Sequence, residues 1–285
     1  MTIQGAVSAV DGPRQRRLRE RYGPWAVVTG ASDGIGREMA LRLAEAGVNV
    51  VLVARRAKLL EAQAEEMERQ NPVAARTIAV DLSEPGGPEE LVHRTADLDV
   101  GLLVAAAGFG TSGNFIDSPL DAELQMIDVN CRAVAALTHH FAGRFRARGR
   151  GGVVLLSSLV AFQGVPRAAN YAATKAYVQS LAEGLHLELA PLGVDVIASA
   201  PGPIHSGFAA RAGMQMGMAL PARAVAQATL DALGRRSTVR PGWLSKLLEA
   251  SLRLVTRWGR VRIMARVMGG MTRRGVAPTR PSGTG

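Results

Sequence analysis

One stretch near the start of the chain limits the fold more than any other. Residues 25–29 (WAVVT) form an apolar run typical of a buried strand, and a turn rich in glycine follows from Gly30 to Gly36. Residues 37–47 then show the apolar spacing of an amphipathic helix that ends at a glycine. A strand, a glycine turn and a helix in this order can bind a pyrophosphate, because backbone N–H groups and the helix N-terminus face the anion. The alternative is a glycine turn with a structural role only.

Further apolar segments of strand length alternate with segments of helical periodicity. The expected strands after the first are 48–53, 74–80, 100–107, 153–156, 194–200 and 237–240, and the main expected helices are 58–70, 89–96, 120–146, 168–190 and 221–233. This alternation predicts an α/β fold, a single-domain Rossmann-type doubly wound parallel sheet with helices on both faces. We expect about seven strands in the order 3-2-1-4-5-6-7.

The composition agrees with one large core and gives no sign of a membrane span. Of 285 residues, 47% are apolar and 32 are glycine, as a core with many tight turns requires. The single Cys131 excludes an internal disulfide and agrees with a reducing compartment. No apolar run reaches the roughly 18 residues of a spanning helix, and the N-terminus does not resemble a secretory signal. A cytoplasmic location is therefore expected.

The net charge of +10 is concentrated at the C-terminal end, where twelve basic residues after Gly234 face one acid, Glu249. We expect a basic N-terminal lead-in at 1–23, a dinucleotide-binding catalytic domain at 24–240, and a basic amphipathic extension at 241–285 with a disordered tail. Between residues 14 and 21 of the lead-in, five arginines face only Glu20, which predicts a solvated, mobile arm. No aromatic residues interleave with these arginines, so a nucleic-acid partner is not expected.

The ends of the second and third expected strands bear on which dinucleotide binds. Where an acid would bind the ribose hydroxyls of NAD, the chain has Ala54 followed by Arg55 and Arg56. Arg55 can meet a 2′-phosphate with its charge and planar fork, which favours NADP(H) over NAD(H). Arg56 is either a second ligand or a surface residue. Asp81 can accept a hydrogen bond from the adenine amine beside Leu82, or cap the next helix, or do both.

Three polar residues after the fifth expected strand suit proton transfer to a carbonyl oxygen. Tyr171 and Lys175 are four residues apart and share one helix face, and Ser158 follows the apolar strand. A phenol with an ordinary pKa of about 10 is a weak acid, and a nearby ammonium lowers that pKa toward a useful range. Ser158 can hydrogen-bond the same carbonyl. The alternative is a helix with an ordinary Tyr and Lys.

Apolar side chains around these groups predict an apolar substrate. Candidates are Phe109, Phe162, Phe208 and the methionine at position 214, which with Met216 and Met218 forms either a lid or a core segment. Met214 is thus a candidate substrate contact. No metal site is expected, because the adjacent histidines at 139 and 140 lack metal-ligand spacing.

Two further features point to the same region. The turn of residues 201–206 (PGPIHS) follows the sixth expected strand, at the edge where parallel sheets bind ligands. Asn130 lies midway along a helical pattern, and because Asn is a weak helix former, this position suggests a packing or site role.

In order, these motifs resemble those of the short-chain dehydrogenase/reductase family, in its classical branch. The resemblance covers about residues 24–240 and rests on TGASDGIG at 29–36, Asp81, AAAG at 105–108, Asn130, Ser158, YAATK at 171–175 and PGPIHS at 201–206. It implies a cofactor site formed by Gly30, Ser32, Asp33, Gly34, Ile35, Arg55, Asp81, Leu82, Ala107, Gly108, Tyr171, Lys175, Pro201, Gly202, Ile204 and Ser206.

The resemblance also implies catalytic roles. Tyr171 would protonate the carbonyl oxygen, Lys175 would bind the ribose and lower the Tyr171 pKa, and Ser158 would polarise the carbonyl. Asn130 would position water beside Lys175. The chain departs from the family where two asparagines usually stand at 105 and 106. It also has Asp33 where a basic residue is usual, so Arg55, alone or with Arg37, would carry the NADP preference.

We therefore predict an NADP(H)-dependent oxidoreductase that reduces a ketone, or oxidises the alcohol, on an apolar substrate such as a 3-ketoacyl or polycyclic ketone. The alternatives are an NAD-linked alcohol dehydrogenase and a cofactor-bound regulator or scaffold without enzyme activity. Family members are commonly oligomeric, so a homodimer or homotetramer through helices 120–146 and 168–190 is expected.

The segment 243–268 is expected to be a basic amphipathic helix, kinked at Gly259, with Trp258, Val261 and Met268 on its apolar stripe. Three roles stay open for it. The first is peripheral contact with an anionic membrane, the second is to cover a lipophilic substrate, and the third is to pack on a second subunit.

Overall fold

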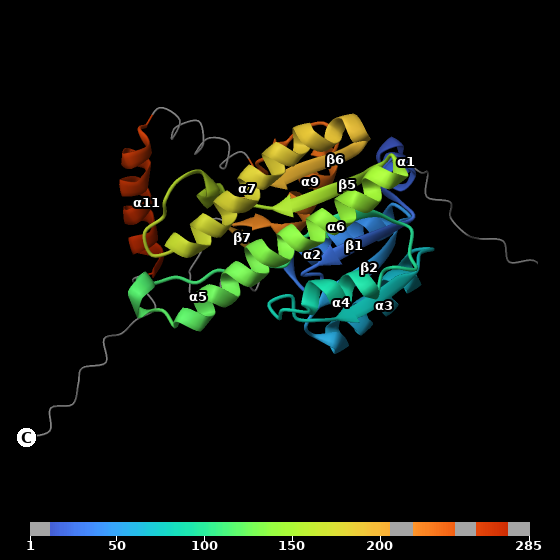
Figure 1. The fold of residues 1–285 in the computed structure, drawn as a ribbon, viewed down its shortest axis with the longest axis horizontal. Helices are drawn as coiled ribbons and strands as arrows, with labels where there is room; N and C mark the ends of the chain where they lie inside the picture. Colours follow the sequence, from blue (N-terminus) through green and yellow to red (C-terminus); the bar gives the residue numbers. More distant parts are fainter. Residues whose placement is uncertain (1–11, 206–218, 243–254, 273–285) are drawn as a thin grey trace, which may run out of the picture.

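Seven parallel strands form the central sheet of the computed structural model, which describes residues 12–205, 219–242 and 255–272 (Figure 1). The spatial order β3-β2-β1-β4-β5-β6-β9 confirms the predicted Rossmann-type order. A second sheet has two strands, β7 and β8. The strands are β1 (Trp25–Thr29), β2 (Asn49–Ala54), β3 (Ala75–Ala79), β4 (Val100–Ala105), β5 (Gly151–Leu156), β6 (Val194–Ser199), β7 (Ile204–His205), β8 (Leu220–Pro221) and β9 (Thr238–Val239).

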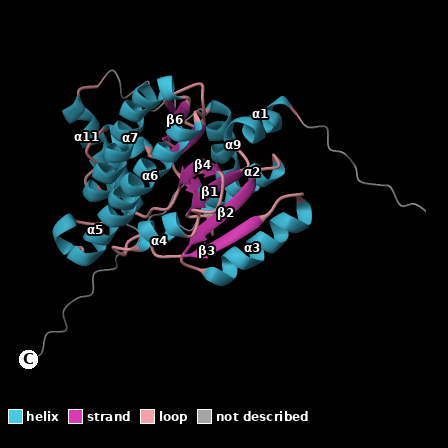
Figure 2. Cartoon of the chain, turned by 45° about the vertical axis from the view of Figure 1, so that its right-hand side comes forward, coloured by secondary structure: helices cyan, strands magenta, loops and turns pink. Residues whose placement is uncertain are grey.

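Helices cover both faces of this sheet (Figure 2). One face carries α2 (Gly34–Glu45), α3 (Ala57–Gln70) and α9 (Ala222–Ala232), and the other carries α4 (Gly87–His93), α6 (Ala133–Arg148) and α7 (Ala169–Leu189). Val28 packs on the first face and its neighbour Val27 on the second, and both are fully buried. Burial on both faces explains why the strands are apolar throughout. Short 3-10 helices are η1 (Phe115–Asp117), η3 (Leu159–Phe162) and η4 (Ala190–Leu192).

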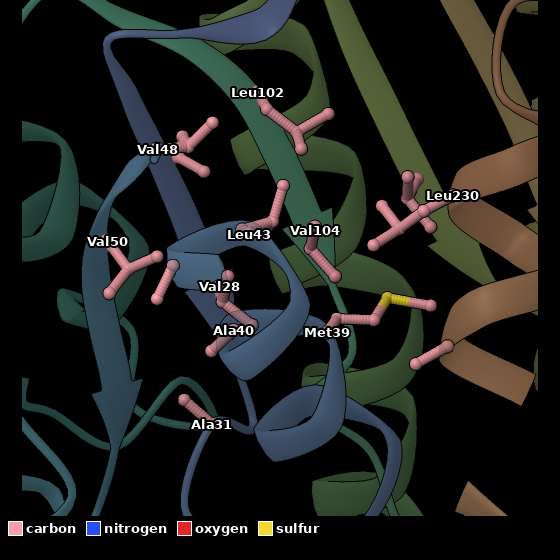
Figure 3. Close-up of a cluster of buried hydrophobic side chains, with 14 of the residues drawn as sticks. Val28, Ala31, Met39, Ala40, Leu43, Val48, Val50, Leu102, Val104 and Leu230 are labelled. Carbon is pink, nitrogen blue, oxygen red and sulfur yellow. The ribbon is translucent and has the colours of Figure 1, made fainter. Parts of the chain in front are cut away.

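The core under α2 positions the glycine turn that precedes this helix (Figure 3). Met39 and Leu43 of α2 are fully buried in one cluster with Val28 of β1 and Leu102 of β4. Leu230 of α9 closes the same cluster on the side of Met39. Each buried side chain of this size stabilises the fold by about 1.5–3 kcal/mol. The start of α2 is therefore held firmly against the end of β1.

The N-terminal segment is a packed helix, α1 (Pro13–Tyr22), so the expectation of a solvated, mobile lead-in is wrong for these residues. Leu18 and Tyr22 are buried in the core on the α2 side. The Tyr22 hydroxyl donates to Asp195 Oδ2 at 2.8 Å. Its ring lies against Gly152, where an added Cβ would be 2.9 Å from the ring. The helix thus closes the amino-terminal side of β5 and β6.

The arginines of α1 have partners far along the chain. Arg17 donates to the Leu230 and Leu233 carbonyls at 2.8 and 2.6 Å, which satisfies the C-terminal end of α9. Arg21 pairs with Asp195, and Arg14 pairs with Asp231. These two partners lie 174 and 217 positions away. A comparison of the acidic and basic residues within 1–23 therefore does not reveal these ion pairs.

The long helix expected at 120–146 is interrupted. It consists of α5 (Leu120–Ile127), a π-helical turn (Asp128–Arg132) and α6. Asn130 lies in the π turn. Such turns insert one extra residue and occur frequently at functional sites.

The last described helix, α11 (Arg257–Thr272), stands beyond the carboxyl ends of the strands (Figure 1). Residues 243–254 of the expected helix lie outside the described residues, and Gly259 lies in the first turn of α11 instead of at a kink. The expected stripe is wrong at Trp258, which is 65% exposed, whereas Met268 is buried against Val165 and Ala172. Within the described residues, no helix is long and apolar enough to cross a bilayer.

We expect Tyr22→Phe to lower the free energy of unfolding by about 1–2 kcal/mol, because it removes the buried hydrogen bond to Asp195. Urea unfolding followed by circular dichroism measures the change. The control is Tyr177→Phe, at a side chain 42% exposed, for which we expect a change within about 0.5 kcal/mol. Equal effects of the two substitutions would contradict the packing described for α1.

Candidate active site

A cleft of about 980 Å³ runs along the carboxyl-terminal ends of the strands. One end, called here the glycine end, is lined by residues of the glycine turn and by the ends of β2 and β3. The other end, called the roof end, is lined by Phe109, Phe162, Arg240 and one face of α11. Ser158, Tyr171 and Lys175 also line the cleft. The sequence-predicted cofactor residues within the described part of the chain therefore share one cavity with Ser158, Tyr171 and Lys175, whereas Asn130 does not line it.

The glycine turn approaches the backbone after β4 too closely for any side chain. Gly30 has a φ of +66°, and an added Cβ would lie 2.8 Å from the Ala107 nitrogen. Gly34 begins α2 with a φ of +56°, and its N–H donates to Asp33 Oδ1 at 2.7 Å. Ser32, Asp33, Gly34 and Ile35 all line the cleft, as predicted. The N-terminus of α2 thus opens into the glycine end, where it suits an anion.

Two guanidinium groups gather at the glycine end. Arg56 Nη2 donates to Ser32 Oγ at 2.9 Å, and Arg55 Nη1 lies 3.4 Å from Asp81 Oδ2. Sequence reasoning emphasised Arg55 and left the role of Arg56 open, yet Arg56 is the residue that contacts the glycine turn. Arg37 pairs with Glu38 at 3.7 Å and is not among the described residues that line the cleft.

Asp81 lines the cleft beside Leu82 and caps the turn after β3, but the expected cap of the next helix is wrong, because α4 begins at Gly87 with Gly86 as its N-cap. Its Oδ1 accepts hydrogen bonds from the N–H and the hydroxyl of Ser83, at 2.9 and 2.7 Å. Burial opposes ionisation, but the Ser83 hydrogen bonds and the charge of Arg55 outweigh it and lower the pKa of Asp81. The carboxylate is therefore a fixed acceptor at the edge of the glycine end.

A threonine supports the backbone after β4, where the family usually has two asparagines. Thr29 Oγ1 accepts a hydrogen bond from the Ala107 N–H at 3.0 Å and lies 3.4 Å from the Val104 carbonyl. Ala107 and Gly108 then line the cleft as predicted. An added Cβ at Gly108 would be 2.9 Å from Asn130 Oδ1, so this glycine permits close packing against the π turn.

Asn130 joins the loop after β4 to α7. Its Nδ2 donates to the Phe109 carbonyl at 2.9 Å and to Thr174 Oγ1 at 3.0 Å, and its Oδ1 accepts from the Phe109 N–H at 3.2 Å. Thr174 Oγ1 in turn donates to the Tyr171 carbonyl at 2.8 Å. The buried Asn130 side chain therefore joins two walls of the cleft, the loop after β4 and helix α7. The predicted positioning of a water beside Lys175 stays a prediction.

Ser158, Tyr171 and Lys175 converge as their spacing predicts. Tyr171 and Ser158 are hydrogen-bonded, and Ser158 Oγ also accepts from the Val160 N–H at 3.4 Å. Lys175 Nζ lies 5.7 Å from the centroid of the Tyr171 ring and donates to the Leu156 carbonyl at 2.7 Å. A hydroxyl, a phenol and an ammonium thus form one cluster in the wall of the cleft.

The pKa of Tyr171 moves opposite to our expectation. Burial raises it to about 12, and the hydrogen bond with Ser158 offsets only part of this rise. Burial also lowers the pKa of Lys175 to about 8. The expected lowering of the phenol pKa by the ammonium is therefore wrong for this structure, because desolvation of the phenol is the larger effect.

Some of the remaining predicted residues line the cleft, and the others lie in segments of the chain that the structure does not describe. Pro201, Gly202 and Ile204 line the cleft, and the Pro201 carbonyl accepts from the Leu159 N–H at 3.0 Å. The predicted contacts Ser206, Phe208 and Met214 lie outside the described residues. Among the described residues, no group of three His, Cys, Asp or Glu side chains is placed to hold a metal ion.

Several lining residues were not predicted from the sequence. They include Arg240 after β9, Gln163, and Arg260, Ile263, Met264 and Val267 of α11. The amphipathic pattern of the C-terminal segment indicates that one face of α11 is covered, but it does not show that this face lines the cleft. For Arg240 the sequence carries no signal.

A family model described as short chain dehydrogenase matches residues 24–216. The chain belongs to the short-chain dehydrogenase/reductase family. As a member, it is an oxidoreductase that acts on CH–OH groups. Its curated relatives include a 7beta-hydroxysteroid dehydrogenase of Clostridium sardiniense, 37% identical over 63% of this chain and 69% of the relative. A very-long-chain 3-oxoacyl-CoA reductase of Podospora anserina is 35% identical over 68% of this chain and 61% of that protein.

Solved structures of this short-chain dehydrogenase family share the fold. One is a structure from work on 7beta-hydroxysteroid dehydrogenase stereoselectivity, with a TM-score of 0.81, 28% identity, and coverage of 87% of this chain and 98% of that chain. Another is a short-chain dehydrogenase from Sphingobium yanoikuyae in complex with NADPH, with a TM-score of 0.74 and 29% identity. It is matched over 90% of this chain and all of that chain.

We expect the stability of the wild-type protein relative to Lys175→Met to rise between about pH 8 and 10.5. In this window an unfolded chain keeps the Lys175 proton while the folded chain has released it, so the unfolded state binds more protons and stability rises with pH. Urea unfolding at several pH values measures the difference. The control is Lys58→Met, on the exposed side of α3. A flat or falling difference for Lys175→Met would contradict the burial of its ammonium.

Proposed function

We propose that this short-chain dehydrogenase uses NADP(H) to reduce a ketone on a large apolar substrate. The observation that carries the proposal is the convergence of Ser158, Tyr171 and Lys175 in the wall of one cleft that has a glycine turn at one end and an apolar roof at the other. A second dinucleotide, NAD(H), is the alternative within the same reaction class.

The residues of the glycine end fit a phosphorylated dinucleotide, which when bound supplies or accepts the hydride. The N–H groups at the start of α2 suit its pyrophosphate. Two cations and a hydroxyl, from Arg55, Arg56 and Ser32, line the glycine end together, and this supports NADP(H) over NAD(H), because such groups suit a 2′-phosphate. We assign Asp81 and Leu82 to the adenine, Lys175 to the ribose, and the turn from Pro201 to Ile204 to the nicotinamide carboxamide.

Tyr171 gives its proton to the carbonyl oxygen, and Ser158 holds that oxygen in place. With a pKa of about 12, the phenol stays protonated at neutral pH, which suits the reductive direction because an alkoxide is a stronger base than a phenolate. Lys175, with a pKa of about 8, can return a proton toward the phenol near neutral pH. Asn130 bonds to Thr174 of α7 and to Phe109 in the loop after β4, and we assign it the support of a relay water as well.

The roof end supports an apolar substrate. Phe109, Phe162 and the α11 residues Met264 and Met268 surround it, and Met268 packs beside Ala168 next to Tyr171. A polycyclic ketone or a 3-ketoacyl chain suits such walls, and the names of the hydroxysteroid and 3-oxoacyl-CoA relatives agree with both. Of the three roles open for the C-terminal helix, covering a lipophilic substrate is the one these contacts support.

We also propose that the protein is a homodimer or homotetramer. Exposed apolar side chains on α5 and α7 support this, and they are Leu120, Leu124, Ile127 and Leu187. Peripheral contact with a membrane and a cytoplasmic location stay predictions.

We expect Tyr171→Phe to lower kcat by about 10²- to 10⁴-fold, because it removes the proton donor. Turnover is followed by NADPH absorbance on a panel of cyclic and 3-keto substrates, and NADPH affinity, measured by fluorescence, should be unchanged. Tyr177→Phe, on the exposed side of the same helix, serves as the control and should keep full activity. Retained turnover in Tyr171→Phe would refute the assigned role, and loss of NADPH binding would show that the substitution perturbs the fold.

We expect the double substitution Arg55→Gln with Arg56→Gln to raise the Kd for NADPH by about 10- to 100-fold, because two charged contacts to one phosphate are lost. The Kd for NADH should change by less than about twofold. Arg37→Gln, outside the cleft lining, is the control. Equal affinities of the wild-type protein for NADPH and NADH would favour an NAD-linked enzyme.

A further inference from the structure

We propose that the protein docks on an anionic lipid bilayer through one exposed face of α11 together with η1. This inference goes beyond the proposed function, because it concerns a surface outside the cleft and its test requires no turnover. It agrees with that function, since an apolar ketone leaves water for a bilayer readily.

Helix α11 has two faces with different surroundings. Four apolar residues spaced as one helical face line the cleft, and they are Ile263, Met264, Val267 and Met268. The opposite side is called here the outer face, and its members are Trp258, Arg262, Ala265 and Arg266. All four members of the outer face are exposed, and none of them is among the described residues that line the cleft. The inner face is therefore covered, whereas the outer face points away from the sheet.

The outer face combines cations with one large aromatic ring. Helix α11 contains four arginines and no acidic residue, and Arg257, beside the outer face, is exposed as well. Trp258 is 65% exposed, and the guanidinium carbon of Arg262 lies 3.6 Å from the centroid of its ring. Tryptophan is enriched at the level of lipid headgroups, and arginine is attracted to anionic headgroups. The stacked pair thus presents both kinds of group at one point of the surface.

The short helix η1 adds exposed apolar side chains next to α11. Phe115 is 56% exposed and Ile116 is 90% exposed, and neither is among the described residues that line the cleft. The Gly113 N–H, just before η1, donates to the Arg167 carbonyl at 2.9 Å, and Met268 of α11 packs on the same loop before α7. Figure 1 and Figure 2 show α11 and α5, which follows η1, at the same end of the molecule. The two elements therefore contribute to one surface.

An anionic bilayer matches this mixture of side chains better than a nucleic acid or a second copy of the chain. A nucleic acid would meet the arginines but leave Ile116 without an apolar partner. A second copy in a symmetric contact would bring like charges together. A bilayer offers headgroup charges above an apolar layer, so it suits both kinds of side chain. The acid of η1, Asp117, accepts from Asn114 Nδ2 at 2.8 Å and is outnumbered by the exposed arginines of α11.

Docking through this surface would hold the roof end of the cleft next to the bilayer. Helix α11 would then contact lipid with its outer face and cover the substrate with its inner face. Two of the roles left open for the C-terminal helix are therefore compatible, because they use opposite sides of one helix.

The test measures binding of the full-length protein to vesicles by sedimentation. One set of vesicles is phosphatidylcholine alone, and the other contains about 30% phosphatidylserine, which is anionic. The outer-face variant is Arg262→Gln with Arg266→Gln, and the matched control is Arg235→Gln with Arg236→Gln. Arg235 and Arg236 are exposed too, but they precede β9 and lie at the amino-terminal side of the sheet. The two variants therefore lose equal charge at opposite ends of the molecule.

The wild-type protein should bind the anionic vesicles in preference to the neutral ones, and binding should weaken as the salt concentration rises. The outer-face variant should raise the Kd for anionic vesicles by about 10- to 30-fold, because each arginine at such a surface contributes about fivefold. The control variant should change this Kd by less than about threefold, because its charges lie beyond the screening length.

Two further measurements test the apolar part of the contact. Ile116→Ala should raise the Kd by about 3- to 10-fold, whereas Leu192→Ala, at an exposed side chain of η4, should leave it unchanged. A variant with Trp25→Phe and Trp243→Phe keeps Trp258 as its single tryptophan. Brominated phosphatidylcholine mixed into the anionic vesicles should quench the fluorescence of this tryptophan.

The proposal is overturned if the wild-type protein does not bind anionic vesicles, if the outer-face and control variants weaken binding equally, or if Trp258 is not quenched in the folded single-tryptophan variant. Without vesicle binding, duplex DNA binding that depends on Arg262 and Arg266 would assign the outer face to a nucleic acid. A changed oligomeric state of the outer-face variant, again without vesicle binding, would assign it to a second copy.

Turnover of a small water-soluble ketone with NADPH separates this inference from the proposed function. It should be unchanged in the outer-face variant and in Ile116→Ala, because the substituted residues are not among the described residues that line the cleft. Absence of turnover in the wild-type protein would count against the proposed function, while vesicle binding would still decide the inference. The thermal midpoint of each variant shows whether it is folded.

Discussion

The hydrogen bond from Lys175 Nζ to the Leu156 carbonyl is the contact on which the site depends. Leu156 ends β5 and Lys175 belongs to α7, so this bond fixes a helix against the end of a strand inside the protein. Ser157 Oγ adds a second link by donating to the Lys175 carbonyl at 3.1 Å. Ser158 is the next residue along the chain, and Tyr171 lies one helical turn before Lys175. The positions of both hydroxyls therefore follow from one enclosed ammonium and its main-chain acceptor.

The cleft provides two different environments on the two sides of these hydroxyls. At the glycine end, backbone N–H groups, Arg55, Arg56 and Asp81 form a polar, partly exposed surface. At the roof end, Phe109, Phe162 and the methionines of α11 form an apolar wall. A reaction that moves a hydride and a proton between two bound molecules benefits from this division, because excluding water strengthens every electrostatic contact around the reacting atoms.

The sequence was sufficient for features that depend on local pattern. The order of strands, the glycine turn and the grouping of Ser158, Tyr171 and Lys175 follow from apolar periodicity and residue spacing, and the family resemblance identified the Asn130 position. Features that depend on distant contacts were not predictable in this way. The arginines of α1 find their partners near the other end of the chain, and the high pKa of Tyr171 results from enclosure that spacing does not reveal. The direction in which α11 turns its arginines required the fold itself.

The Asn130 side chain has a mechanical consequence for the enzyme. It bonds to both backbone groups of Phe109, in the loop after β4, and to Thr174, on the helix that carries the proton donor. The loop after β4 and helix α7 are therefore coupled through one side chain, and a displacement of either would strain the hydrogen bonds to the other.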